Sequence, residues 1–326
     1  MKHVTTTIAL LLGAALLSSC GAGSSPEAPS AAAGGVSAVT VKSCDEDLKL
    51  AAPPTKVLLL GDTDASILLG LGVMDRVTAR AGHVPQGAYS SADYDKLQSL
   101  REIPTDKLDN GGAKLATEVV LNERPDLVIG YDTGLDREAL RKAGIPVYSP
   151  DAFCTGYAVK KASFDLVGEE ITKIGAIFGV SERASVLKDR MADELRTLAK
   201  RDEGGATAVA LYITPGETTF YAYGASSMVQ PILEVNGLTN VYADQSKRVF
   251  DASMESLLAT NPDRVILLWG DGTAEQARAT FLGFRGVDKM KAVRSGNVVT
   301  LPFSLTDPPT MLSVQGAAQL HAALAR

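Results

Sequence analysis

Residues 118–131 read EVVLNERPDLVIGY, and residues 255–269 read ESLLATNPDRVILLW. In both stretches a glutamate stands seven residues before a Pro-Asp pair, and that pair leads into an apolar run. We interpret each stretch as a helix that begins near the glutamate, where a carboxylate favours the helix dipole, and that gives way to a buried strand at Pro-Asp. The copies lie 137 residues apart. They therefore predict two similar α/β halves.

The chain around these copies alternates between β-rich runs and helical periodicity. We predict strands at 56–60, 124–130, 146–148, 207–213, 264–268 and 297–301. We predict helices at 63–71, 136–143, 228–235, 254–259, 274–281 and 311–324. Strands separated by helices indicate βαβ units and parallel sheets. Residues 162–178 and 182–200 have helical spacing with no strand between them, so one or two long helices are expected to join the halves.

The N-terminal region has the pattern of a lipoprotein leader. Lys2 precedes an apolar run of ten residues, 8–17, whereas a membrane span needs about 20, so residues 1–19 are predicted to be a secretory signal. The run ends in Leu-Ser-Ser-Cys at Cys20, which resembles the lipobox of bacterial lipoproteins; an ordinary signal with an incidental cysteine is the alternative. Residues 20–41 are rich in Gly, Ala and Ser and are predicted to be a flexible tether. The body is then expected outside the cell membrane, anchored by lipid on Cys20.

Composition excludes several classes of site. The chain has 32 Lys and Arg against 38 Asp and Glu, a net charge of −6, which does not favour a nucleic-acid partner. Three histidines are too few for a metal site built from several imidazoles. With Cys20 assigned to lipid, Cys44 and Cys154 remain as an even pair in an oxidising compartment. They either form a disulfide that closes a loop of 110 residues or stay as two buried thiols.

Residues 42–326 resemble a known family, the substrate-binding lipoproteins of ABC importers for ferric siderophores, haem or vitamin B12 (class III periplasmic binding proteins). The resemblance rests on Pro53-Pro54 before VLLLG, and on ILLGLGVMDRV, NERPDLVIG, VNGLTNVYAD, MESLLATNPDRVIL and FRGVDKMKAVRSGNVVTLP, in that order. It implies an α/β fold of two Rossmann-like lobes with parallel sheets, bridged by a long rigid α-helix. The expected boundaries are 42–160 for the N-terminal lobe, 161–180 for the bridging helix and 181–326 for the C-terminal lobe.

The resemblance also implies partners. In this family a glutamate on each lobe pairs with arginines of the permease, and the matching positions are Glu118 and Glu255. The alternative is that both carboxylates only favour the starts of their helices. A subgroup of the family carries one cysteine before the first strand and one near the end of the first lobe, as Cys44 and Cys154 do. The implied protein is a monomer that captures its ligand between the lobes and delivers it to an ABC importer.

In open α/β sheets the ligand lies beyond the carboxyl ends of the strands, so the loops that follow the strands hold the candidate contacts. Aromatic side chains there offer broad apolar contact with a polar group, which suits a bulky amphipathic chelate. The predicted ligand-binding residues are Asp62, His83, Tyr89, Tyr131, Tyr221, Tyr223, Ser226, Trp269 and Phe303.

The charges near these loops favour a ferric hydroxamate siderophore as the ligand. Arginines are few there, with only Arg80 and the Lys247-Arg248 pair nearby, whereas a triply anionic catecholate would want more positive charge. Haem, with a Tyr or His83 as axial ligand, and cobalamin are the alternatives. No cofactor is expected, and no metal is expected to be bound directly by protein side chains.

An enzymatic alternative rests on Asp62 and Asp64. They follow a buried strand in the pattern Asp-x-Asp, as in phosphotransferases whose first aspartate attacks phosphorus. Gly61 before the pair and the absence of a clear downstream Lys and acidic loop argue against this function. The sequence also has no GxSxG, HExxH or GxxxxGK[ST] motif. A binding protein and not an enzyme is therefore expected.

Overall fold

Both Pro-Asp corners end their helices in the same way. The computed structural model describes residues 38–325, except 86, 108–112 and 200–203. Helix α3 (Thr117–Glu123) ends at Arg124, and helix α8 (Met254–Thr260) ends at Asn261. Both end residues adopt the left-handed backbone conformation, with φ of 49° and 42°. The sequence repeat therefore marks two equivalent helix ends, one in each half.

The aspartate of each corner accepts hydrogen bonds from residues at the start of a neighbouring strand. Asp126 accepts hydrogen bonds from the backbone N–H groups of Thr55 and Lys56 at 2.7 and 2.9 Å, just before strand β3 (Val57–Leu60). Asp263 accepts from the backbone N–H and hydroxyl of Thr207 at 2.8 and 2.9 Å. Each Pro-Asp corner is therefore tied to the start of a neighbouring strand.

The first sheet is parallel throughout its described strands. Its spatial order is β5 (Arg101–Ile103), β4 (Val77–Ala81), β3, β8 (Leu127–Gly130) and β9 (Val147–Tyr148). Numbered by their place in this sheet, the strands run 3-2-1-4-5, the order of a Rossmann-like sheet. The predicted α/β class and Rossmann-like topology are thus confirmed in this half.

The second sheet is mixed, which departs from the expected parallel sheet. Strands β10 (Thr207–Ile213), β14 (Arg264–Trp269) and β15 (Val298–Pro302) are parallel neighbours, and β12 (Thr239–Asn240) also pairs parallel with β10. On the other side β11 (Phe220–Tyr223) and the edge strand β13 (Val249–Ala252) run antiparallel. The edge strand β13 has no buried residue, whereas β11 is buried except at Tyr221.

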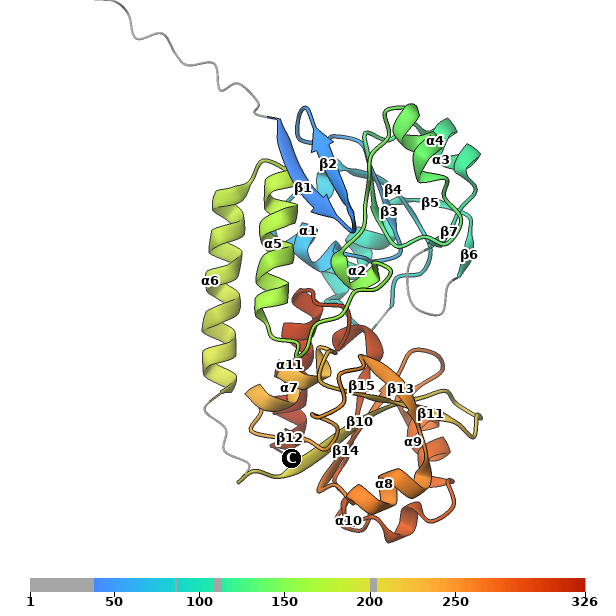
Figure 1. Ribbon diagram of the computed structural model, residues 1–326, viewed down its shortest axis with the longest axis vertical. Coiled ribbons are helices and arrows are strands. Elements are labelled where there is room, and N and C mark those ends of the chain that lie inside the picture. The colour runs from blue at the N-terminus through green and yellow to red at the C-terminus, as the bar shows by residue number, and fades with distance from the viewer. Residues whose placement is uncertain (1–37, 86, 108–112, 200–203, 326) are drawn as a thin grey trace, which may run out of the picture. The chain divides into compact units, whose positions relative to one another are not determined.

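Two helices connect the halves and lie side by side, as Figure 1 shows. Helix α5 (Asp165–Ile177) buries Val167, Ile171 and Ile174 in the first core. Helix α6 (Ser181–Leu198) buries Ala184, Leu187 and Met191 in that same core, whereas Leu198 near its end belongs to a core of the second half. Helix α6 therefore connects both interiors, and α5 packs along it.

A hairpin precedes the first sheet, and the sequence analysis missed it. Strands β1 (Val39–Ser43) and β2 (Glu46–Leu50) pair antiparallel, and Val41, Leu48 and Leu50 pack into the first core. Cys44 in its turn is joined to Cys154 by a disulfide, with 5.2 Å between the Cα atoms. Of the two alternatives for these cysteines, the structure has the bonded pair.

The remaining elements complete the two halves. They are α1 (Ala65–Gly70), α2 (Ser91–Gln98), β6 (Asp106–Lys107), β7 (Ala113–Lys114), α4 (Arg137–Lys142), α7 (Val229–Val235), α9 (Ala274–Leu282), α10 (Lys291–Arg294), α11 (Met311–Leu324) and the 3-10 turns η1 (Met74–Arg76), η2 (Asp151–Phe153), η3 (Val287–Lys289) and η4 (Phe303–Leu305). Among the described residues no helix has the length and apolar character needed to cross a membrane. The predicted signal over 1–19 and nearly all of the predicted tether over 20–41, with Cys20, lie outside these residues.

Candidate functional site

The reversal of strand order in the first sheet places the candidate site. Strands β3 and β8 are neighbours at the centre of the sheet. From β3 the chain continues to β4 on one side, and from β8 it continues to β9 on the other. Open α/β sheets bind ligands beyond the carboxyl ends of the strands at such a reversal of order. Asp62 follows β3, and Tyr131 follows β8. Both predicted site residues therefore stand at the expected edge of the sheet.

Asp62 and Tyr89, both predicted as ligand contacts, lie against one another. The Tyr89 hydroxyl donates to Asp62 Oδ2 at 2.9 Å. Burial raises the pKa of Asp62 to about 6, although the Tyr89 hydrogen bond opposes the shift. The carboxyl can hold a proton in mildly acidic conditions, so it can act as a hydrogen-bond donor or acceptor there.

Asp64, two residues further on, is turned into the interior. It is fully buried, has a left-handed φ of 56°, and neither of its carboxyl oxygens has a hydrogen-bond partner by ordinary geometry. Burial raises its pKa well above the usual value, and the neighbouring carboxyl of Glu170 on α5 adds to the shift. An aspartate enclosed in this way has no access to a phosphate ester, so the structure does not support the Asp62–Asp64 phosphatase alternative.

Glu170 on α5 is a second buried carboxyl residue, next to Asp64. It is 5% exposed and accepts a hydrogen bond from the Tyr148 hydroxyl at 2.5 Å. Burial raises the pKa of Glu170 to about 7 against the opposing effects of Tyr148 and Lys173. Lys173, one turn further along α5, forms an ion pair with Asp151 at 2.6 Å. Sequence reasoning missed Glu170, although its place among Val167, Ile171 and Ile174 on the apolar face of the helix could have revealed it.

A buried ion pair connects the second half to the first. Arg248 Nε donates to Asp307 Oδ2 at 2.6 Å, where the side chains are 32% and 2% exposed. Arg248 Nη1 also donates to the carbonyl oxygen of Ala152 at 3.4 Å. Burial raises the pKa of Asp307, whereas the Arg248 charge opposes that shift. The pair places two balanced charges beside the strand-end loops of both halves.

Aromatic rings surround this pair in the second half. Phe303 contacts Tyr212 edge to face at 5.3 Å between ring centroids, and Tyr223 at 6.2 Å. Tyr221 lies directly opposite Tyr212 in the β10–β11 register and is 45% exposed. Burial, and then Asp307, raises the pKa of Tyr223 above its usual value. The predicted residues Tyr221, Tyr223 and Phe303 are thus brought together, with Tyr212 as a member that the sequence analysis had placed inside a strand.

The first half supplies a second aromatic pair. Tyr131 stacks on Phe153, with 5.1 Å between ring centroids and 22° between the planes. Phe153 is the neighbour of Ala152, whose carbonyl accepts from Arg248. The two aromatic groups therefore approach the Arg248–Asp307 pair from different halves of the chain.

Trp269 and Ser226 are placed differently. Trp269 packs with the core that holds Leu267 and Phe281, whereas Tyr212 packs with the core on the other face of the sheet. The alternation of side chains along a strand separates the two rings. The Trp269 Nε1–H is buried without a hydrogen-bond partner. Ser226 is 8% exposed, in the loop after β11.

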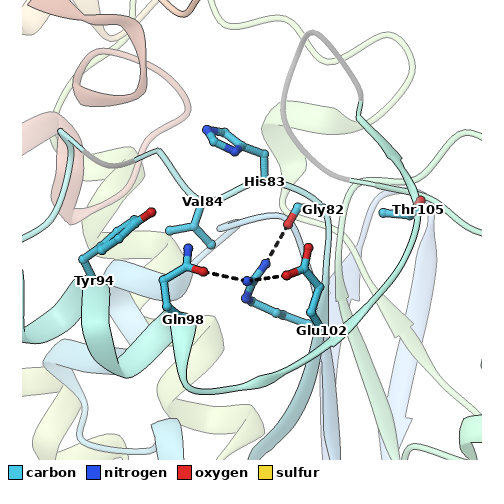
Figure 2. A pocket seen from close by; sticks show the side chains of 8 residues that line it. Gly82, His83, Val84, Tyr94, Gln98, Glu102 and Thr105 are labelled. Carbon is cyan, nitrogen blue, oxygen red and sulfur yellow. Dashed lines mark hydrogen bonds and ion pairs between the residues drawn. The ribbon is translucent and has the colours of Figure 1, made fainter.

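His83 lies apart, at a separate cavity of about 370 Å³. Figure 2 shows its imidazole at the edge of the opening, pointing away from Gln98 and Glu102. The buried Arg80 guanidinium donates to Gly82 and Leu97 carbonyl oxygens, and to Gln98 and Glu102 side chains at 2.8 and 2.9 Å. The Arg80 guanidinium thus already donates to four acceptors, one of them a carboxylate, so few of its N–H groups remain for an anionic ligand.

Glu118 and Glu255 are both exposed, in the first turns of α3 and α8. The start of α3 is fastened to the loop after β8, because the Thr117 hydroxyl accepts from the Asp136 N–H at 2.8 Å. The two glutamates therefore occupy matching positions in the two halves, as the repeat predicts, and remain accessible to a protein partner.

Comparison with known proteins identifies the family. Residues 57–305 match the family described as periplasmic binding protein. The chain belongs to the periplasmic binding protein family. No curated protein matches it. Among solved structures, the ABC-type Fe3+-hydroxamate transport system of Saccharomonospora viridis is 32% identical, with a TM-score of 0.80, over 88% of this chain and 99% of that chain.

More distant periplasmic binding proteins share the fold. The haem-binding protein RhuT of a Roseiflexus species is 21% identical, with a TM-score of 0.63, over 82% of this chain and 97% of that one. The vitamin B12-binding protein BtuF of Vibrio cholerae is 18% identical, with a TM-score of 0.57, over 84% and 97%. The expected family of siderophore, haem and vitamin B12 binding proteins is confirmed, and with it a substrate-binding transport protein in place of an enzyme.

Proposed function

We propose that this periplasmic binding protein captures a ferric hydroxamate siderophore between its two lobes and delivers it to the permease of an ABC importer. The observation that carries the proposal is the 32% identity over 88% of the chain to a protein described as an Fe3+-hydroxamate transport system. The working unit is a monomer. Its proposed lobes span residues 42–160 and 181–326 with 161–180 as the bridging segment, and α6 at the start of the second lobe also packs in the first core.

The charges at the candidate site support an uncharged or weakly charged chelate. Arg248 is paired with Asp307, and Arg80 is held by four acceptors. A triply anionic catecholate complex that paired with Arg248 would have to displace Asp307, which leaves a buried carboxylate unpaired at high cost. The rings of Tyr131, Tyr223 and Phe303 need no such exchange to contact the apolar surface of a hydroxamate chelate.

The proposal is tested by titrating the purified protein with four probes and following fluorescence. The probes are ferrichrome as an uncharged ferric trihydroxamate, ferric enterobactin as a triply anionic catecholate, haem, and cyanocobalamin. Sub-micromolar affinity for ferrichrome, and much weaker affinity for the others, is expected. Tighter binding of haem or cyanocobalamin than of ferrichrome would contradict a hydroxamate as the ligand and would assign that ligand in its place. Mass spectrometry of protein purified from its own iron-starved cells should detect a bound hydroxamate.

A pair of phenylalanine variants locates the binding site within that titration. Phe303→Ala removes the ring that contacts Tyr212 and Tyr223 and should weaken ferrichrome binding about tenfold, the equivalent of about 1.4 kcal/mol. Phe250→Ala is the matched control, because Phe250 packs on Tyr242 in the core on the opposite face of the sheet. Equal losses for both variants would contradict this placement of the ligand.

We also propose that the protein is held at the membrane by lipid on Cys20. The Leu-Ser-Ser-Cys motif and the Gly-, Ala- and Ser-rich residues behind it support this attachment. Cys20→Ala is expected to move the protein from the detergent-extracted membrane fraction to the soluble fraction in cell fractionation. Continued extraction of the variant only by detergent would contradict lipid attachment.

A further inference from the structure

The N-terminal hairpin is fastened to the loop after β9 at two adjacent positions. Cys44 in the hairpin turn is bonded to Cys154. One residue earlier, the Ser43 hydroxyl oxygen accepts from the Ser149 N–H at 2.8 Å. The Ser149 hydroxyl in turn donates to the carbonyl oxygen of Gly130, the last residue of β8, at 2.7 Å. Residues 149–154 are therefore fixed at both of their ends.

The segment between these fastenings carries three contacts of the candidate site. Asp151 forms its ion pair with Lys173 on α5. The Ala152 carbonyl accepts from Arg248 of the second half, and the Phe153 ring stacks on Tyr131. Within the segment itself, only short-range backbone bonds such as Cys154 N–H to the Asp151 carbonyl oxygen, at 2.9 Å, maintain the turn. Its position is thus set by these three contacts together with the groups at its two ends.

We propose that the Cys44–Cys154 disulfide is a positioning clamp for the ligand site. It holds residues 151–153 where Phe153 completes an aromatic surface and Ala152 meets Arg248. This inference rests on the proposed function, because the benefit of the clamp is ligand affinity. A segment that is already ordered loses less conformational freedom when the ligand binds, so a preorganised site binds more tightly.

The rival role is purely structural. A disulfide that closes a long loop stabilises the fold by constraining the unfolded chain, and that role alone requires no effect on affinity. The two roles differ at a temperature where every variant is fully folded. The clamp predicts weaker binding there, whereas a fold staple predicts unchanged binding.

The decisive comparison uses Cys44→Ser/Cys154→Ser and a control of similar instability. Leu187→Ala is that control, because Leu187 is buried in the first core on α6, where its side chain lies next to Gly70 of α1. With ferrichrome as the probe, the cysteine variant should bind about tenfold more weakly through lost preorganisation, and Leu187→Ala should match the wild type. Equal affinities of all three proteins would overturn the clamp.

A double-mutant cycle tests the route through Ala152. Arg248→Lys keeps a positive charge beside Asp307 but removes the Nη1–H group that donates to the Ala152 carbonyl oxygen. Its effect on affinity should be smaller in the cysteine variant than in the wild type, because coupled contacts are non-additive. Equal effects in the two backgrounds would contradict this route. If the cysteine variant does not fold, Ser43→Ala removes the second fastening while keeping the disulfide, and it should weaken binding in the same direction.

Hydrogen exchange tests the clamp without any ligand. The amides of Phe153 and Cys154 donate within this segment, and the Tyr157 amide donates to the Cys154 carbonyl at its end. All three should exchange faster in the cysteine variant than in the wild type, while strand β3 amides keep their protection. Unchanged exchange at these three amides would overturn the clamp. If the wild type binds none of the four probes, the proposed function fails, and the exchange comparison alone then decides whether the segment is held by the disulfide.

Discussion

Reversing the charge at both Glu118 and Glu255 is expected to abolish ligand uptake while leaving ligand affinity unchanged. We propose that both carboxylates pair with cationic side chains of the permease, one for each lobe. Exposed ion pairs contribute about 0–1 kcal/mol, whereas pairs desolvated in an interface can reach several. Each single change to lysine should therefore impair uptake, and the double change should be worse because no docking contact then remains.

The control for this experiment is Glu182→Lys. Glu182 is also an exposed glutamate in the first turn of a helix, α6, but it lies outside the repeat. If first-turn glutamates only favour their helices, all three single variants should lose a little thermal stability and transport normally. Ligand affinity, melting temperature and uptake should be measured on each variant. Normal uptake by the double variant would rule out docking through Glu118 and Glu255.

The free energy of unfolding is expected to fall as the pH rises from about 4.5 to about 7. Burial raises the pKa of Glu170 from its ordinary value of 4.5 to about 7, so the unfolded chain releases this proton before the folded chain does as the pH rises. Its contribution to stability is complete below pH 4.5 and is lost by about pH 7. A shift of this size corresponds to about 3 kcal/mol of unfolding free energy. Asp64, whose pKa is also raised by burial, acts in the same direction.

Glu170→Gln should remove most of this dependence. The amide keeps the shape of the carboxyl and can still accept from Tyr148, but it cannot ionise. Urea unfolding should show that the variant equals the wild type near pH 4.5 and is more stable by about 2–3 kcal/mol at pH 8. Glu169→Gln, at the exposed neighbouring position, should keep the slope of the wild type. Wild-type stability that is flat or rises between pH 4.5 and 7 would contradict this account.

Parallel strands with an unbroken apolar run could be predicted from the sequence, and strands whose run is interrupted by polar residues could not. The apolar runs at 56–60 and 264–268 correspond to β3 and β14 almost residue for residue. Strand β4 was missed because Thr78 and Arg80 interrupt its pattern, and Arg80 is buried only because Gln98 and Glu102 receive its guanidinium. Those partners lie about 20 residues away in sequence and leave no local signal.

The candidate site was predictable to a similar extent. The rule that ligands bind beyond strand ends selected Tyr131, Tyr223 and Phe303, which the structure places in two aromatic groups. The same rule could not show that Arg248 pairs with Asp307, which lies 59 residues later in the sequence. Because of this pairing, the Arg248 charge is already balanced by a carboxylate. The rule also could not separate Trp269 from the other rings, because the face to which a strand residue points depends on register.

The interiors of the two lobes are not independent. Met228 and Val314, each 1% exposed, lie in the same core as Val57 and Ile171 of the first half. A polypeptide that stopped at residue 160 would lack the α5 residues and both of these side chains, and would expose the apolar faces that they cover. Truncated single-lobe fragments are thus poor candidates for separate expression. Because they share this core, the two halves should melt together in one cooperative transition.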